Sequence, residues 1–144
     1  MKMNLNPWLD KGDIQKVIVT EVSMQGITRI IERDLEDGQI QSLSLDRRFA
    51  TACGAALNIA NYAIRKNGFR VSGKVGHHQI TFDVASEILG KKASRFIDYF
   101  DVCRRKRNKV DYDFADVVSL TEVDELISLV KQFKKIVFNV DLVR

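Results

Sequence analysis

Proline is almost missing from this sequence of 144 residues, which holds only Pro7. Because proline interrupts the interior of a helix, long stretches of the chain carry no obligate helix breaker. Apolar residues recur through those stretches at intervals of three and four positions, the spacing of one face of an α-helix. The sequence therefore predicts an all-α fold, an antiparallel bundle of four to five helices in a single domain over residues 1–144.

Five helical segments are predicted, and they cover about residues 21–37, 45–67, 82–89, 93–114 and 121–140. The segment that follows Ser44, a predicted N-cap, is rich in alanine and glycine, so other backbones can approach it closely. We expect it to be the central helix. Residues 69–81 are predicted to form a glycine-punctuated loop, and no convincing sheet is predicted. The last helix is predicted to begin at Thr121 with a capping box that ends at Asp124.

Composition sets further expectations. Cys53 and Cys103 both fall within apolar helical patterns, where free cysteine behaves as a small hydrophobe, so neither a disulfide nor a metal site is expected. The first residues contain no apolar run typical of a signal peptide, and no segment is long and apolar enough for a membrane span. We therefore expect a cytoplasmic protein that uses no cofactor and contacts no membrane.

The net charge of +4 is concentrated in the middle of the chain. Residues 65–109 carry 12 Lys and Arg against 4 Asp and Glu, which gives +8. The segments before and after them carry −1 and −3. A basic surface attracts phosphate groups by releasing their counterions, so RNA or a nucleotide is a candidate partner, and a solvated surface is the alternative.

The basic run within residues 104–109 separates into two groups when it is placed on a helix. With Phe96 at zero and 100° per residue, Arg107 falls at about 20°, within the apolar stripe that continues through Phe100 and Cys103. Arg105 and Lys109 fall on the opposite side and are expected to be solvated. The residues with a candidate role in nucleic-acid binding are Arg104, Arg105, Lys106 and Lys109.

Arg107 needs a partner, because an isolated charge on a core-facing stripe is costly to remove from water. Asp111 follows one turn later and can form a structural ion pair with it. Alternatively, the stripe faces a polar groove at an active site or a subunit interface, where arginine binds phosphate with two hydrogen bonds. Helix geometry alone leaves both alternatives open.

Arg107 and Asn108, late in a helix of a small bundle, resemble the signature of HEPN domains, in which an arginine and a polar residue precede a histidine. The segments ERDLEDGQIQSLSLDRRFATACGAALNIANYAIRKNGFRVSGKVGHH and CRRKRNKVDYD together resemble a subfamily of small bacterial HEPN proteins. The resemblance implies a helical bundle that forms a homodimer with the two motif helices in a shared cleft. It implies either a metal-independent endoribonuclease of a toxin or defence system, or a non-catalytic partner or regulatory subunit of a nucleotidyltransferase. An antitoxin partner is also implied.

The sequence departs from the HEPN signature at Tyr112, where the motif has histidine. A phenol with a pKa near 10 is a poor base, whereas histidine titrates near neutrality. Tyr112 can instead donate a hydrogen bond to phosphate, stack on a base or accept a nucleotidyl group, and the alternative is a plain surface or helix-end tyrosine. His77 and His78, the only histidines of the chain, are the alternative proton acceptors, and a purely structural role for them stays open. The predicted catalytic set is Arg107, Asn108, Tyr112, His77 and His78.

Overall fold

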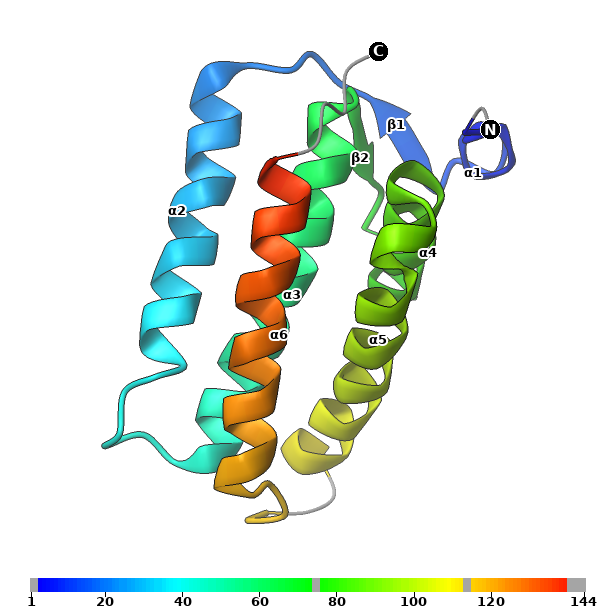
Figure 1. Ribbon diagram of the computed structural model, residues 1–144. Helices are drawn as coiled ribbons and strands as arrows, with labels where there is room; N and C mark the ends of the chain where they lie inside the picture. The colour runs from blue at the N-terminus through cyan, green and yellow to red at the C-terminus, as the bar shows by residue number, and fades with distance from the viewer. Residues whose placement is uncertain (1–2, 74–75, 113–114, 140–144) are drawn as a thin grey trace.

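The computed structural model describes residues 3–73, 76–112 and 115–139, with the backbone alone for residues 110–112. Within these ranges the chain forms six helices and two short strands (Figure 1). The elements are α1 (Asn6–Asp10), β1 (Ile14–Lys16), α2 (Glu21–Asp37), α3 (Leu45–Lys66), β2 (Phe69–Val71), α4 (His77–Leu89), α5 (Lys91–Tyr112) and α6 (Leu120–Phe138). The predicted all-α helical bundle is confirmed.

The long helices lie side by side, and α3 packs against α2, α4, α5 and α6 (Figure 1). Ser44 begins α3 as predicted, since its side chain accepts a hydrogen bond from the backbone N–H of Arg47. Small side chains let the four neighbours approach α3, and its buried alanines are Ala52, Ala55, Ala56, Ala60 and Ala63. The prediction of a central helix is therefore confirmed.

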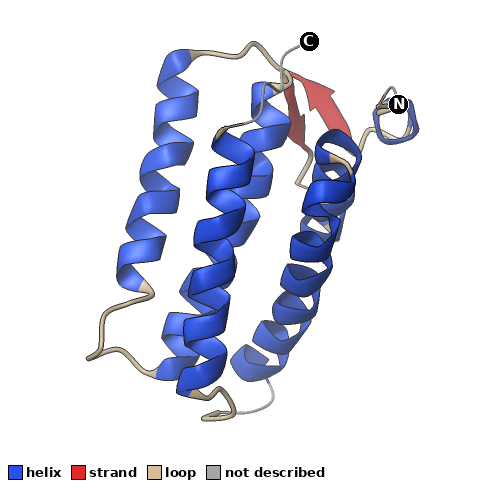
Figure 2. Ribbon diagram, in the orientation of Figure 1, coloured by secondary structure: helices blue, strands red, loops and turns tan. Residues whose placement is uncertain are grey.

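The two strands form an antiparallel sheet at one end of the bundle (Figure 2). Ile14 pairs with Val71 and Lys16 with Phe69. The expectation that no sheet forms was wrong. The loop predicted over residues 69–81 was wrong at both ends, which form β2 and the start of α4, whereas residues 72–73 and 76 lie outside helix and strand. Each strand has three residues, too few for an alternating pattern, and the pairing joins segments far apart in the sequence.

The short helix α1 was not among the predicted segments, and three helices begin earlier than predicted. The helices α4, α5 and α6 begin at His77, Lys91 and Leu120 instead of about residues 82, 93 and 121. The helix α4 begins at His77, immediately after Gly76 in a left-handed conformation with φ of 81°, so the two histidines belong to its first turn. The capping box of α6 consists of Ser119 and Glu122, because the Ser119 side chain and the Glu122 side chain each bond the other residue's backbone N–H. The predicted capping box at Thr121 was wrong by two residues. Ser119 and Thr121 each carry a hydroxyl and are each followed three residues later by an acidic residue, so the pattern fits both positions.

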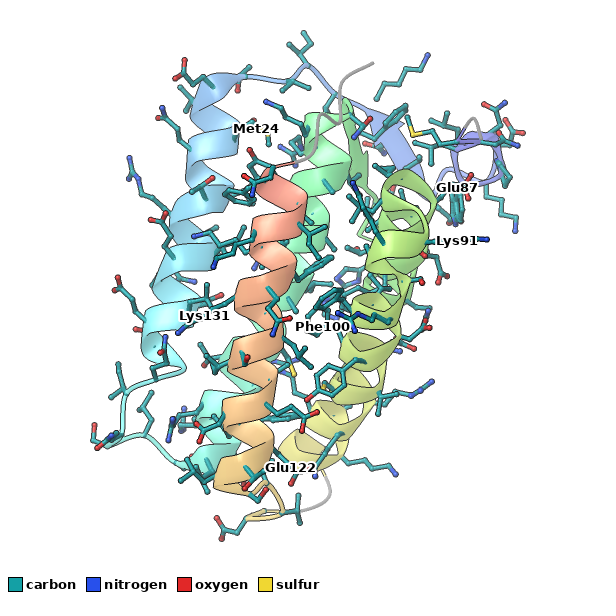
Figure 3. All side chains as sticks on the ribbon, viewed as in Figure 1. Met24, Glu87, Lys91, Phe100, Glu122 and Lys131 are labelled. Atoms are coloured by element: carbon teal, nitrogen blue, oxygen red, sulfur yellow. The ribbon has the colours of Figure 1, made fainter. Side chains whose placement is uncertain are left out.

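Aromatic rings join α5 to α6 across the core. Phe100, labelled in Figure 3, is fully buried, and its ring centroid lies 5.2 Å from that of Phe133. Phe96 contacts the same ring at 6.0 Å. In the part of the chain that the structure covers, no helix has the length and apolarity required to cross a membrane.

Candidate functional site

The basic run of α5 divides as predicted. Phe96, Phe100 and Cys103 are buried, whereas Arg105 and Lys109 are exposed. Arg107 is half-buried and lies on the apolar side of the helix, where it lines a small cavity beside Phe100. The apolar part of this stripe is thus covered by the chain's own helices.

Arg104 and Lys106, two of the predicted nucleic-acid contacts, form bonds between neighbouring helices. The guanidinium of Arg104 donates to Oδ1 of Asp101 and to Oε1 of Gln79, both at 3.0 Å, which ties α5 to α4. Lys106 forms an ion pair with Glu122 at the start of α6, and this hydrogen bond is the first cause that lowers the pKa of the Glu122 carboxyl. Arg105 and Lys109 remain the exposed cations of the run, although Arg105 also pairs with Asp101 at 3.4 Å.

The two histidines lie at the positive end of the α4 macrodipole, and Gly76 offers no side-chain cap there. Their rings contact edge to face, with centroids 4.1 Å apart. His77 is exposed, whereas His78 is half-buried and reaches toward α5. Burial lowers the pKa of the His78 imidazole, and the charges of His77, Arg107 and Arg104 lower it further. The fold thus brings together His78 and Arg107, two of the residues predicted to act in one reaction.

His78 stands between two adjoining cavities. The smaller one, of about 30 Å³, is lined by Cys53, Gly54, Leu57, His78, Phe82, Phe100, Arg104 and Arg107. The larger one, of about 280 Å³, is lined by Ile27, Leu57, Asn58, Asn61, Ile64, Arg65, Phe69, Arg70, Val71, His77, His78 and Thr81. Among the described residues, no carboxylate lines either cavity. The side chains that surround His78 therefore favour an anionic ligand.

Sequence reasoning missed the polar residues of the larger cavity. Asn58, Asn61 and Arg65 occupy one face of α3 at intervals of three and four residues, and Arg70 adds a second arginine from β2. The signal was present as a polar stripe in a helix that is otherwise apolar and small. Only the position of β2 and α4 over that stripe makes it the wall of a cavity.

Asn108 is the described member of the predicted catalytic set that lies away from His78. Asn108 is exposed and lines neither cavity. The side chains of Asp111 and Tyr112 lie outside the described residues, so the Arg107–Asp111 ion pair and the role of Tyr112 stay predictions.

The cysteines lie in the core as predicted. Both thiols are buried, and neither takes part in a disulfide. Burial is the largest influence on Cys103 and raises the pKa of its thiol to about 11, which keeps that sulfur protonated and unreactive near neutrality. No group of three or more His, Cys, Asp or Glu side chains that could hold a metal ion occurs in the described ranges.

Comparisons with protein-family models, with curated proteins and with solved structures found no match to this chain.

Proposed function

We propose that this chain is a HEPN-type protein that acts on RNA as a metal-independent endoribonuclease of a toxin or defence system. The resemblance of the Arg107–Asn108 region and of the preceding segments suggests the class. The observation that carries the proposal is the position of His78, which lines one cavity with Arg104 and Arg107. The imidazole that the motif lacks at Tyr112 is thereby supplied from α4.

The proposed chemistry needs a base and a stabilising cation. His78 takes the proton of a ribose 2′-hydroxyl, and the 2′-oxygen forms a bond to the adjacent phosphorus. The guanidinium of Arg107 stabilises the charge that develops on the phosphorane oxygens. The bond from phosphorus to the 5′-oxygen then breaks, and that oxygen takes a proton from solvent. A lowered pKa suits His78 to the role of base, because the imidazole is then neutral near physiological pH.

Cleavage of a labelled RNA oligonucleotide in the presence of a chelator tests the proposal. Replacing the base, His78→Gln, is expected to reduce the rate by about 10²–10⁴-fold. Replacing the cation, Arg107→Ala, is expected to reduce it by about 10²–10³-fold. The matched control is Arg33→Ala, which removes an exposed arginine from α2.

The variant Tyr112→Phe separates the two candidate bases, since it deletes only the hydroxyl. Full activity in this variant assigns proton transfer to His78, whereas loss of activity assigns a chemical role to the phenol. If the wild-type protein cleaves no RNA and its expression does not harm cells, the ribonuclease proposal is wrong. The chain is then better described as a non-catalytic HEPN partner of a nucleotidyltransferase, which co-purification with such an enzyme would test.

The homodimer stays part of the proposal and rests on the resemblance. The apolar stripe of α5 gives no separate reason for it, because Phe96, Phe100 and Cys103 are buried within one chain. Light scattering on the wild type and on each variant monitors the assembly state during the cleavage experiment.

A further inference from the structure

The larger cavity lies between α3, β2 and the first turn of α4, and it shares Leu57 and His78 with the smaller cavity that Arg107 lines. Its volume of about 280 Å³ is near the lower limit, about 300 Å³, of pockets that enclose small ligands. It has room for one compact ligand rather than for a stretch of polymer.

Arg65 indicates the charge of that ligand. The residue is half-buried, its Nε atom is enclosed, and Nε has no hydrogen-bond partner among the described residues. Within the same ranges no carboxylate forms an ion pair with it. A guanidinium removed from water without a partner is costly, and its planar donors match a phosphate. Arg70, which also bonds Gln15 at 3.3 Å, adds a second positive charge to the same wall.

The rest of the wall is suited to a nucleobase. The amide nitrogen of Asn58 donates to the carbonyl of Gly54 at 3.0 Å, so the Oδ1 of Asn58 remains an available acceptor in the cavity wall. Asn61 makes no side-chain hydrogen bond to any residue that the structure describes, so both its donor and its acceptor are available. Leu57 and Phe69 supply apolar surface beside these amides. Carboxamides next to an apolar wall can bond the edge of a base whose face is covered.

We propose that this cavity is a nucleotide subsite, in which Arg65 and Arg70 bind a phosphate and Asn58 and Asn61 bind the edge of the base. The inference rests on the proposed function. In an RNA substrate, the nucleotide in this cavity is the one next to the phosphodiester that is cleaved at His78. His78 lines both cavities, whereas Arg107 is a lining residue of the smaller one. The subsite gives the protein a preference for the base next to the cleaved bond.

Calorimetric titration of the purified protein tests the subsite without any cleavage reaction. The probes are the four nucleoside 5′-monophosphates, with the matching nucleosides and inorganic phosphate as separate arms. At least one monophosphate is expected to bind about tenfold or more tightly than either fragment, because both halves of the cavity are then filled. Losing a charge-assisted hydrogen bond in Arg65→Gln is expected to weaken that binding by about 10–100-fold.

A second variant keeps the test decisive if Arg65→Gln fails to fold. Asn61→Asp is nearly isosteric and places a carboxylate beside Arg65, so it is expected to weaken monophosphate binding without lowering the melting temperature. Arg33→Gln, an exposed arginine of α2, is the charge-matched control and should bind within about twofold of the wild type. Arg107→Ala, which lies outside the larger cavity, should also retain binding while it loses cleavage.

The outcomes separate the two proposals. If no monophosphate binds, or if Arg65→Gln and Asn61→Asp bind as well as the wild type, the subsite is wrong even where RNA is cleaved. If inorganic phosphate binds as tightly as every monophosphate, the asparagines contact no base and the nucleotide assignment is wrong. If a monophosphate binds as expected and no RNA is cleaved, the subsite is supported and the ribonuclease proposal fails.

Discussion

At the scale of single residues, the imidazole of His78 combines partial burial with the arginines Arg107 and Arg104 and the neighbouring ring of His77. Burial comes first among the causes that lower its pKa, followed by His77, Arg107 and Arg104. The facing groups on α5 and α4 include Arg104, Arg107 and Gln79. The carboxylates bonded to these groups already have partners, since Asp101 pairs with Arg104 and Arg105, and Asp83 accepts from Gln79. The environment therefore favours the neutral base.

This ionisation predicts a pH dependence of stability. Because the pKa of His78 is lower in the folded state than its ordinary value of 6.5, the unfolded chain binds more protons as the pH falls below that value. The contribution of His78 to the free energy of unfolding is thus present at higher pH and is lost on acidification. Urea denaturation between about pH 5 and pH 8 should show this decline, and His78→Gln should reduce it.

An NMR titration provides the independent check. The His78 imidazole, assigned through the His78→Gln spectrum, should titrate below its ordinary range. A midpoint at or above 6.5 would contradict the described environment, and the proposed base would then be charged over more of the physiological range.

At the scale of elements, the junction of α5 and α6 depends on the cap at Ser119. Its hydroxyl accepts from the backbone N–H of Glu122, and the Glu122 carboxylate bonds both the Ser119 backbone and Lys106 of α5. The Glu122 carboxylate thus takes part in the N-terminal cap of α6 and also joins α6 to α5. Figure 3 shows Glu122 at this start of α6.

The variant Ser119→Ala removes the cap and should lower the free energy of unfolding by about 1 kcal/mol, measured by urea denaturation. Thr121→Ala is the matched control, because Thr121 is exposed and lies inside the helix rather than at its cap. Replacing it with alanine, the strongest helix former, should leave stability unchanged or slightly raise it. Equal losses in both variants would contradict the observed cap.

At the scale of the whole molecule, the segment of residues 65–109, with its excess of +8, supplies cations to the proposed site from several elements. Arg65 and Arg70 reach the larger cavity from α3 and β2, whereas Arg105 and Lys109 are exposed on α5. Such a distribution attracts a polyanion over long range before any specific contact forms.

RNA binding should therefore weaken steeply as the salt concentration rises. Arg105→Ala and Lys109→Ala should each reduce the slope of log affinity against log salt by about 1, without a change in fold. Fluorescence anisotropy with a labelled oligonucleotide measures the slope, and Arg33→Ala on α2 is the control for charge loss elsewhere. Salt-independent binding would show that these side chains are ordinary solvated charges.

The sequence by itself determined the long helices and the orientation of the basic run, whereas the short α1 and the start of α4 were not predicted. The bounds of α2 and the cap at Ser44 follow from local repeats and capping residues, which act over a few positions and are visible in the chain. The same periodicity placed Arg107 on the buried side of α5 and Arg105 and Lys109 on the solvated side, as the structure shows.

Only the tertiary structure decided how the site is assembled. The pairing of β1 with β2 joins Gln15 to Arg70 across 55 positions, and no local repeat encodes such a contact. That pairing and the left-handed Gly76 precede α4, whose first turn sets His78 beside Arg107. Asn58, Asn61 and Arg65 become the wall of a cavity for the same reason. Their proximity depends on long-range packing of several elements, whereas a periodic pattern reports only the face of one helix.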